Sequence, residues 1–169
     1  MGGLLEQVDG GWRLRFTRRY AHRPEKVWRA LTEPEHLAAW FPTMIEFPDG
    51  QRVAGAKLRF TFPNGEAPPF DGELLAYAPP EVLELRWGTD VLRFELRADG
   101  EGTELTLLDL LDEKGKAARD AAGWHVCLDN LAAHLDRGED AATQWQDVHA
   151  DYVERFGPDA ATIGPPDGS

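Results

Sequence analysis

The chain has 169 residues, which is the length of a single ordinary domain. Its 30 acidic and 18 basic residues give a formal net charge of −12, which argues against binding nucleic-acid phosphates or an anionic membrane. One cysteine excludes an internal disulfide bond and a cysteine-based zinc site. No apolar run approaches the roughly 20 residues of a membrane-spanning helix, and the start lacks a signal-peptide pattern. The composition therefore predicts a soluble, cytoplasmic, acidic protein that binds neither nucleic acid nor membrane.

The two ends of the chain are dominated by glycine, proline and small or polar residues. This composition predicts a flexible N-terminus over residues 1–10 and a disordered tail over residues 158–169. Between them we expect one folded domain over residues 11–138 and an appended helical segment over residues 139–157.

The folded region begins with a predicted half-buried strand, because apolar and polar residues alternate over residues 12–16. Two short helices are predicted next, starting near Pro24 and Pro34, since proline suits the first turn of a helix. Residues 43–111 then alternate in short runs separated by turn residues. This pattern predicts about six antiparallel strands joined as hairpins.

The hydrophobic period becomes helical again over residues 117–137. Gly138 stands where such a helix usually ends. The apolar positions at helical spacing are Trp124, Leu128, Leu131 and Leu135.

A further helix is predicted over residues 141–156. We expect its apolar stripe to pack against the protein's own body rather than a partner, since intramolecular contact avoids the entropy cost of association. The stripe consists of Trp145, Val148, Tyr152 and Phe156.

A long amphipathic helix that follows a curved antiparallel sheet can bury its stripe across the concave face of the sheet. The predicted fold class is therefore α+β. A sheet wrapped around a helix often leaves an apolar space between the two.

Residues 20–42, YAHRPEKVWRALTEPEHLAAWFP, resemble the opening signature of the Activator of Hsp90 ATPase homologue-like family, within the START/Bet v 1-like (SRPBCC) superfamily. Gly102-Thr103 with residues 105–107 resembles the last strand of that family, and Gly123-Trp124 resembles the start of its C-terminal helix. The resemblance spans residues 12–137. It implies a helix-grip fold, in which a strand, two helices and six strands precede a long helix.

The sequence also departs from this family. His22-Arg23 stand where relatives usually have a small residue followed by proline, and the predicted helix over residues 141–156 lies beyond the family pattern. Eukaryotic activators carry a separate N-terminal domain that contacts the chaperone, and 169 residues leave no room for one. We therefore expect the isolated protein not to stimulate an Hsp90-type ATPase substantially.

Several large apolar side chains fall on the predicted inner face of the sheet and helix. Such residues ordinarily pack in the hydrophobic core. Helix-grip relatives, however, commonly keep the space between sheet and helix open, and in that case these side chains would form the walls of a pocket. The candidate ligand-binding residues are Phe60, Phe62, Trp87, Phe94, Leu105, Leu107, Asp109, Trp124 and Leu128.

Asp109 shares the phase of Leu105 and Leu107 in the last predicted strand. If it faces the space beneath the helix, it could bind a polar ligand head or act as an acid or base, because a buried carboxyl needs a partner. The alternative, which we favour from sequence, is that the strand ends near Asp109 and the acid lies in water.

No established catalytic motif occurs in the chain. His125 and Asp129, four residues apart on the long helix, could approach one metal ion, but the same spacing also suits an ordinary hydrogen bond and no third ligand is evident. Cys127 flanks an apolar stripe, which predicts an inert thiol. Serine occurs only as Ser169, which excludes a serine nucleophile. We expect no catalytic residue, metal or cofactor.

Three functions are compatible with these features. The first is a carrier or sensor of a small hydrophobic or amphipathic molecule. The second is a chaperone co-factor or protein-interaction domain, and the third is a cyclase- or hydratase-type enzyme. The fold resemblance and the aromatic lining favour the first. The missing N-terminal domain weakens the second, and the third is weakened because Asp109 is the only ionisable pocket candidate. Fold alone does not decide among them.

Overall fold

A computed structural model of the chain describes residues 2–63, 65, 67–138 and 141–164. Within these residues, eight strands form one antiparallel sheet in the order β1-β2-β8-β7-β6-β5-β4-β3. The strands are β1 (Leu4–Val8), β2 (Gly11–Tyr20), β3 (Met44–Glu46), β4 (Lys57–Thr61), β5 (Phe70–Ala78), β6 (Val82–Trp87), β7 (Asp90–Asp99) and β8 (Gly102–Leu111).

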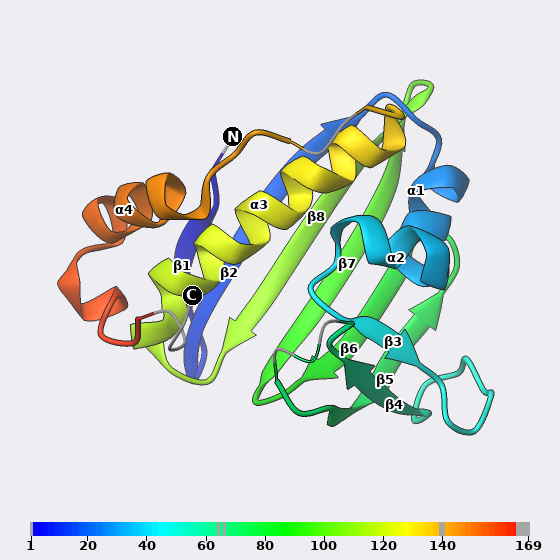
Figure 1. The fold of residues 1–169 in the computed structure, drawn as a ribbon, viewed down its shortest axis with the longest axis horizontal. Helices are drawn as coiled ribbons and strands as arrows, with labels where there is room; N and C mark the ends of the chain where they lie inside the picture. The colour runs from blue at the N-terminus through cyan, green and yellow to red at the C-terminus, as the bar shows by residue number, and fades with distance from the viewer. Residues whose placement is uncertain (1, 64, 66, 139–140, 165–169) are drawn as a thin grey trace.

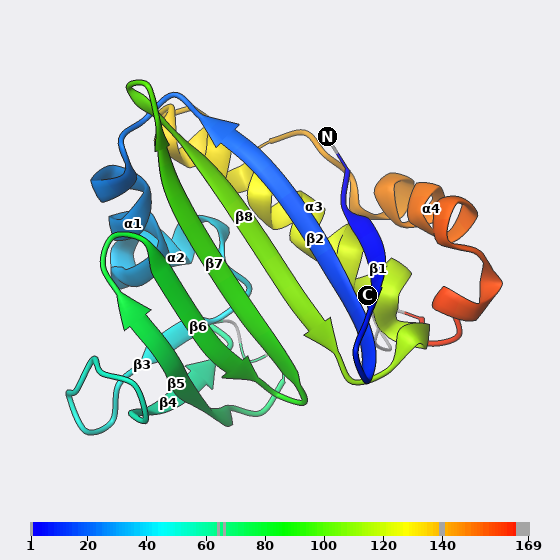
Figure 2. The same ribbon diagram turned by 180° about the vertical axis from the view of Figure 1, so that it is seen from behind.

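The helices gather on one side of this sheet. Figure 1 shows α3 crossing over the β2 and β8 side, with α1 and α2 on the same side, whereas Figure 2 shows the opposite face without a helix over it. In the described part of the chain, no helix is both long and apolar enough to cross a bilayer. The helices are α1 (Pro24–Thr32), α2 (Pro34–Trp40), α3 (Ala117–Leu135) and α4 (Trp145–Phe156), with short 3-10 helices η1 (Lys114–Lys116) and η2 (Pro158–Ala160).

The element order confirms the predicted α+β, helix-grip architecture. After α2, six strands follow as successive antiparallel neighbours, and the last of them, β8, pairs with β2. The register places Phe16 opposite Leu107 and Leu107 opposite Phe94, so alternate side chains of three strands share one face. This face is apolar, and it is the face that α3 covers.

One part of the core lies between the sheet and the C-terminal part of α3. Leu128 and Leu131 are fully buried on α3, and Phe16 and Leu105 are fully buried on the sheet. Aliphatic side chains at i and i+3 on a helix project toward the same neighbours, so they interdigitate with the strand residues. This part of the interface is packed.

The two short helices are fixed to the sheet by their tryptophans. Trp40 donates a hydrogen bond from Nε1 to the Ala30 carbonyl oxygen at 2.7 Å, which ties α2 to α1. Its ring lies 6.2 Å from that of Phe94 on β7, and the Trp28 ring lies 5.4 Å from that of Tyr77 on β5. Both tryptophans therefore join the helices to the sheet.

The prediction of a flexible N-terminus is wrong for residues 4–8. These residues form β1, which pairs along its length with the start of β2. Glu6 accepts from Arg13 at 3.3 Å and from Arg15 at 2.9 Å, and Gly10 takes the positive φ that the hairpin turn requires. The strand forms because an already ordered edge supplies hydrogen-bond partners that composition does not reveal.

The boundaries of the C-terminal helix also differ from the predicted ones. The predicted helix over residues 141–156 begins at Trp145, because the preceding residues are held to α3: Thr143 Oγ1 donates to Asp129, and the Ala141 amide donates to Asn130 at 3.1 Å. The apolar stripe of α4 packs against the protein's own core, as predicted, with Tyr152 fully buried.

The first residues of the predicted disordered tail are ordered instead. Residues Pro158–Ala160 form η2, Ala160 is fully buried, and the Ile163 amide donates to the Gly115 carbonyl oxygen at 3.1 Å. Residues 165–169 of that predicted tail lie outside the described residues.

Candidate functional site

An open cleft of about 760 Å³ lies between the N-terminal half of α3 and one end of the sheet. The turn between β6 and β7 and the neighbouring ends of β4 and β5 form its opposite side. It is lined by Pro42, Phe62, Phe70, Trp87, Gly88, Thr89, Asp90, Asp109, Lys116, Arg119, Asp120, Gly123, Trp124, Val126, Cys127 and Trp145.

Aromatic rings form most of the apolar wall, and Trp87 is at their centre. Its ring centroid lies 4.8 Å from that of Phe60, 5.0 Å from Phe70 and 5.3 Å from Phe41, each in an edge-to-face arrangement. The Trp124 ring of α3 lies 6.0 Å from the Trp87 ring, also edge to face, so the two rings link the helix to the sheet. Such edge-to-face contacts are favourable and hold the rings in fixed orientations.

The sequence produces this wall through two glycines. Gly88 adopts a φ of 59° directly after Trp87, so the chain turns into β7 while the indole stays at the end of β6. A Cβ atom on Gly72 would lie 2.4 Å from the Phe60 ring, so a glycine is needed for that ring to cross β5. These positions shape the wall without contributing side chains to it.

Four of the nine residues predicted to bind ligand line the cleft: Phe62, Trp87, Asp109 and Trp124. The other five are packed core instead, each with at most 1% of its surface exposed: Phe60, Phe94, Leu105, Leu107 and Leu128. The alternation within the strands predicted which sheet residues share a face, and the helical period did the same for Trp124 and Leu128. Neither pattern carries information on where along that face α3 and the sheet separate.

Sequence reasoning missed several lining residues. Phe70 follows Pro68-Pro69 and was not assigned to a strand, and Trp145 was interpreted only as part of the stripe of α4. Gly123 also lines the cleft, and a Cβ atom there would meet nothing within 4 Å. A glycine in the interior of a long helix is unfavourable, so its presence there calls for a reason. Gly123 was therefore the one feature of the sequence that could have indicated open space beside this part of α3.

Asp109 lies inside the protein rather than in water, so the alternative favoured from sequence is wrong. Strand β8 continues to Leu111, and Asp109 is paired with Leu14 on β2 and Leu92 on β7. Only 1% of its surface is exposed. The Trp124 indole donates from Nε1 to Asp109 Oδ2 at 3.1 Å, while Asp109 Oδ1 is buried and receives no hydrogen bond from any described residue.

Two further carboxyl groups surround Asp109. One oxygen from each of Asp90, Asp109 and Asp120 lies within 4.8 Å of the others. Lys116 Nζ donates to Asp90 Oδ1 at 2.8 Å, and Arg119 Nε donates to Asp120 Oδ1 at 2.9 Å. We call these five residues the charged floor of the cleft.

Burial controls the ionisation of the charged floor. Desolvation raises the pKa of the Asp109 carboxyl well above its usual range, and the nearby Asp90 and Asp120 carboxyls raise it further. Burial also raises the pKa of Asp120, although Arg119 opposes that change. Burial disfavours the charged form of Lys116, but hydrogen bonds to Asp112 and Asp90 outweigh it and raise the Lys116 pKa. The proton-bound form of Asp109 is therefore the favoured one.

The cleft does not offer a reactive thiol. Cys127 lies in its wall, and burial raises the pKa of its thiol to about 12. A thiol with such a pKa stays protonated at neutral pH, whereas nucleophilic cysteines work as thiolates. This agrees with the expectation of an inert Cys127.

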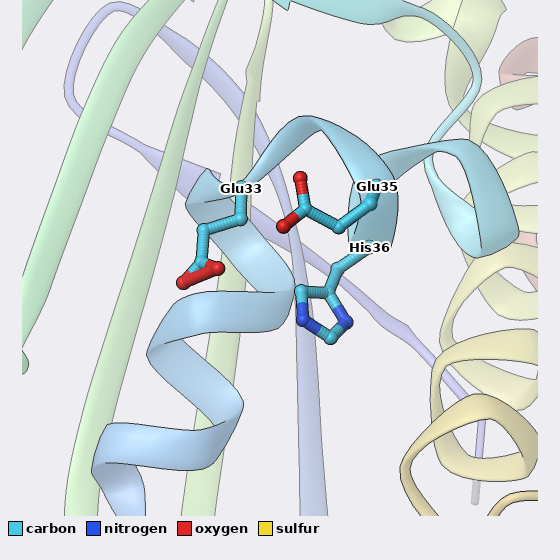
Figure 3. A group of neighbouring side chains, drawn as sticks. All are labelled: Glu33, Glu35 and His36. Carbon is cyan, nitrogen blue, oxygen red and sulfur yellow. The ribbon is translucent and has the colours of Figure 1, made fainter.

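Oxygen and nitrogen donors gather at two places in the described residues. The three aspartates of the charged floor could offer oxygen ligands, but the cations Lys116 and Arg119 already neutralise two of them. The second group is Glu33, Glu35 and His36. Figure 3 shows these side chains around the start of α2, where their proximity follows from their closeness in sequence.

The predicted pair His125 and Asp129 is engaged in a polar network. His125 Nδ1 lies 2.8 Å from the Tyr152 hydroxyl, and its Nε2 lies 3.6 Å from Asp129 Oδ2. Arg18 donates to Asp129 at 2.7 Å. These contacts join β2, α3 and α4, which is a structural arrangement.

Comparison with known proteins places these features in context. The family model described as "Activator of Hsp90 ATPase homolog 1-like protein" matches residues 21–136. No curated protein matches the sequence significantly.

Solved structures share the fold. EF2215 from Enterococcus faecalis, a conserved protein of unknown function, has a TM-score of 0.77 at 21% identity over 91% of this chain and 90% of its own. The protein encoded by BPP1335 from Bordetella parapertussis has a TM-score of 0.70 at 26% identity, with 90% of each chain covered. DynU16, from the dynemicin biosynthetic locus, has a TM-score of 0.64 at 26% identity over 76% of this chain and 48% of its own.

The matched region begins just after β2 and ends one residue beyond α3, so it contains the two short helices, six strands and the long helix that form most of the cleft. Trp145 of α4 lies outside it. Because the match covers more than half of the sequence and the helix-grip architecture agrees with it, the chain belongs to the Activator of Hsp90 ATPase homolog 1-like protein family.

Proposed function

We propose that this protein binds a small, largely apolar molecule in the cleft and acts as a carrier or sensor of that molecule. The observation that carries the proposal is the cleft itself, with its volume of about 760 Å³ and its aromatic walls. Ligand sites in proteins typically measure about 300 to 1,000 Å³ and are mostly apolar, with a few placed polar groups. The cleft matches that description in both size and composition.

The energetics support binding of moderate affinity. Removing about 200 Å² of apolar ligand surface from water contributes about 5 kcal/mol at the usual coefficient. Part of this is lost to the reduced freedom of the ligand, which leaves an affinity in the micromolar range. Flat rings from Phe70, Trp87 and Trp124 favour a ligand that contains rings or acyl chains.

The similarity to DynU16 agrees with a small-molecule role, because that protein comes from a biosynthetic locus. A catalytic role has less support, since the cleft wall supplies no activated nucleophile: its cysteine thiol is held protonated by burial. The carrier or sensor role requires only the apolar wall and a polar anchor.

The test uses N-phenyl-1-naphthylamine, a neutral dye that fluoresces in apolar sites, followed by displacement with fatty acids, flavonoid-like and polyketide-like compounds. We expect saturable binding at one site and a rise in melting temperature. The matched variants are Gly123→Phe, which places a ring in the cleft, and Gly123→Ala, which adds only a methyl group to open space.

Gly123→Phe should weaken dye binding at least tenfold while the melting temperature is retained, and Gly123→Ala should bind like the natural sequence. Equal binding to both variants would place the dye elsewhere and contradict the proposal. An absence of dye binding and of any thermal shift across the panel would do the same.

A further inference from the structure

Among the residues that the structure describes, Asp109 differs from the other acids of the charged floor in having no cation paired with it. Among the described ion pairs, Asp90 is joined to Lys116 and Asp120 to Arg119, both within 3 Å. Within the described part of the chain, Asp109 accepts one hydrogen bond, from Trp124, and no donor reaches its other, buried oxygen. The nearby Asp90 carboxyl can only share a proton with it. Asp90 and Asp120 are thus each neutralised by one cation, whereas none of these ion pairs neutralises Asp109.

A buried carboxylate beside other carboxylates is strongly disfavoured, and a proton is the simplest way to neutralise it. The groups that face Asp109 are Asp90 from β7 and Asp120 and Trp124 from α3. The cations of the charged floor, Lys116 and Arg119, are paired with Asp90 and Asp120 instead. Asp109 therefore carries a proton, and its carboxyl group has an O–H to donate.

We propose that the protonated Asp109 donates a hydrogen bond to a carbonyl oxygen of the molecule bound in the cleft, so that the preferred ligands are aromatic or acyl compounds with a carbonyl group. This inference rests on the proposed function of the cleft. A protonated carboxyl group in an apolar site is an effective donor to such an oxygen. In the free protein, the Asp90 carboxylate is the nearest alternative acceptor.

The charges in the cleft disfavour other polar ligands. An organic ammonium group would meet Lys116 and Arg119, which line the same cleft, and would have to displace the proton of Asp109. An organic carboxylate would meet the carboxyl groups of Asp90 and Asp120. A neutral oxygen acceptor incurs neither repulsion, and it accepts the hydrogen bond from the proton of Asp109 in place of Asp90, the acceptor in the free protein.

The experiment compares probes that share one apolar body: 2-acetylnaphthalene, its isostere 2-isopropenylnaphthalene, and 1-(2-naphthyl)ethylamine. At mildly acidic pH, we expect the ketone to bind roughly three- to tenfold more tightly than the isostere, which is the effect of one hydrogen bond. The amine should bind more weakly than the ketone. The carbonyl stretching band of the bound ketone should shift to lower wavenumber.

Variants at Asp109 separate its possible roles. Asp109→Leu should abolish the preference for the ketone and the infrared shift, whereas Asp109→Asn retains an N–H donor and should keep much of both. The preference should decline with rising pH in the natural protein, as Asp109 loses its proton, but not in Asp109→Asn. Glu101→Gln, a matched change in the turn at the far end of β7, is the control, since its side chain is 93% exposed.

The outcomes distinguish the two proposals. If the isostere binds and the ketone binds no more tightly, the role of Asp109 is wrong and the ligand-binding function stands. If the amine binds most tightly and Asp109→Asn abolishes this, Asp109 is a counter-ion and the inference is also wrong. If no naphthalene probe binds, both fail. Should Asp109→Leu not fold, the pH profile and the infrared shift still decide.

Discussion

The two halves of the interface between α3 and the sheet are built differently. Toward the C-terminus of α3, Leu128 and Leu131 are fully buried against sheet residues such as Leu105 and Leu107. Toward its N-terminus, the same helix borders the cleft. In Figure 1, α3 lies above β2 and β8, whereas β4, β5 and β6 curve to one side of it.

The difference shows that one helix can border both a packed core and an open cleft. Branched aliphatic side chains fill the packed half, because they interdigitate at the density of a crystal. In the other half, Ala118, Ala121 and Ala122 are fully buried on one side of the helix, and large rings and ion pairs line the cleft on the other. The Trp87 and Trp124 rings, with centroids 6.0 Å apart, link α3 to the end of β6 there. The following predictions test whether the two halves are energetically separate.

The largest effect is expected from truncating the packed half. Leu128→Ala should lower the free energy of unfolding by about 3 kcal/mol, because it leaves a cavity that the surrounding core cannot fill. Val126→Ala, two residues away in the cleft wall, should cost less than about 1 kcal/mol. Urea denaturation measures both values, and similar costs would show that the cleft side is as tightly packed as the core.

A smaller effect is expected where the two halves meet. Trp124→Phe keeps an aromatic ring but removes the N–H that donates to Asp109. We expect a loss of about 1 to 2 kcal/mol, since a buried oxygen loses its hydrogen-bond donor. The same denaturation assay checks this. If the variant were as stable as the natural protein, the Trp124–Asp109 hydrogen bond would contribute nothing to folding.

Asp109→Asn should change the pH dependence of stability. The pKa of Asp109 is higher in the folded chain than in the unfolded chain, where it is about 3.9. The folded state therefore binds this proton more tightly, so the contribution of Asp109 to stability is full at low pH and is lost as pH rises toward the folded-state pKa. Asparagine has no such proton.

The melting temperature of Asp109→Asn relative to the natural protein should therefore increase with pH across that window. Differential scanning calorimetry at several pH values measures it. The other acid with a raised pKa, Asp120, is present in both proteins, so its contribution largely cancels. A difference that does not vary with pH would mean that Asp109 is ionised throughout.

The smallest effect is expected from Gly123→Ala. The added methyl group meets nothing within 4 Å, and alanine is the better helix former, so we expect a gain of about 0.5 to 1 kcal/mol. Thermal denaturation checks the sign. A loss of stability would mean that the cleft side of α3 lacks the open space on which the comparison of the two halves depends.

The order of elements was predictable from the sequence alone. The alternation over residues 12–16 and within 43–111, followed by a helical period over residues 117–137, is a local property that the backbone imposes on any sequence burying one face. The resemblance of residues 20–42 to a known family independently led to the same helix-grip fold, and the family match confirms it. The dipeptide Asp9-Gly10, which favours a hairpin turn, is also present in the sequence. The composition of the first ten residues nevertheless predicted a flexible N-terminus.

Tertiary structure decided how the inner face is divided. Phe60 and Phe62 are two residues apart on the same face, yet the first is core and the second lines the cleft. Local periodicity identifies a face but not the distance to what lies opposite, which depends on sheet curvature and on the position of α3. For the same reason, the sequence could not show that Asp90, Asp109 and Asp120 meet at the charged floor, because they come from separate elements.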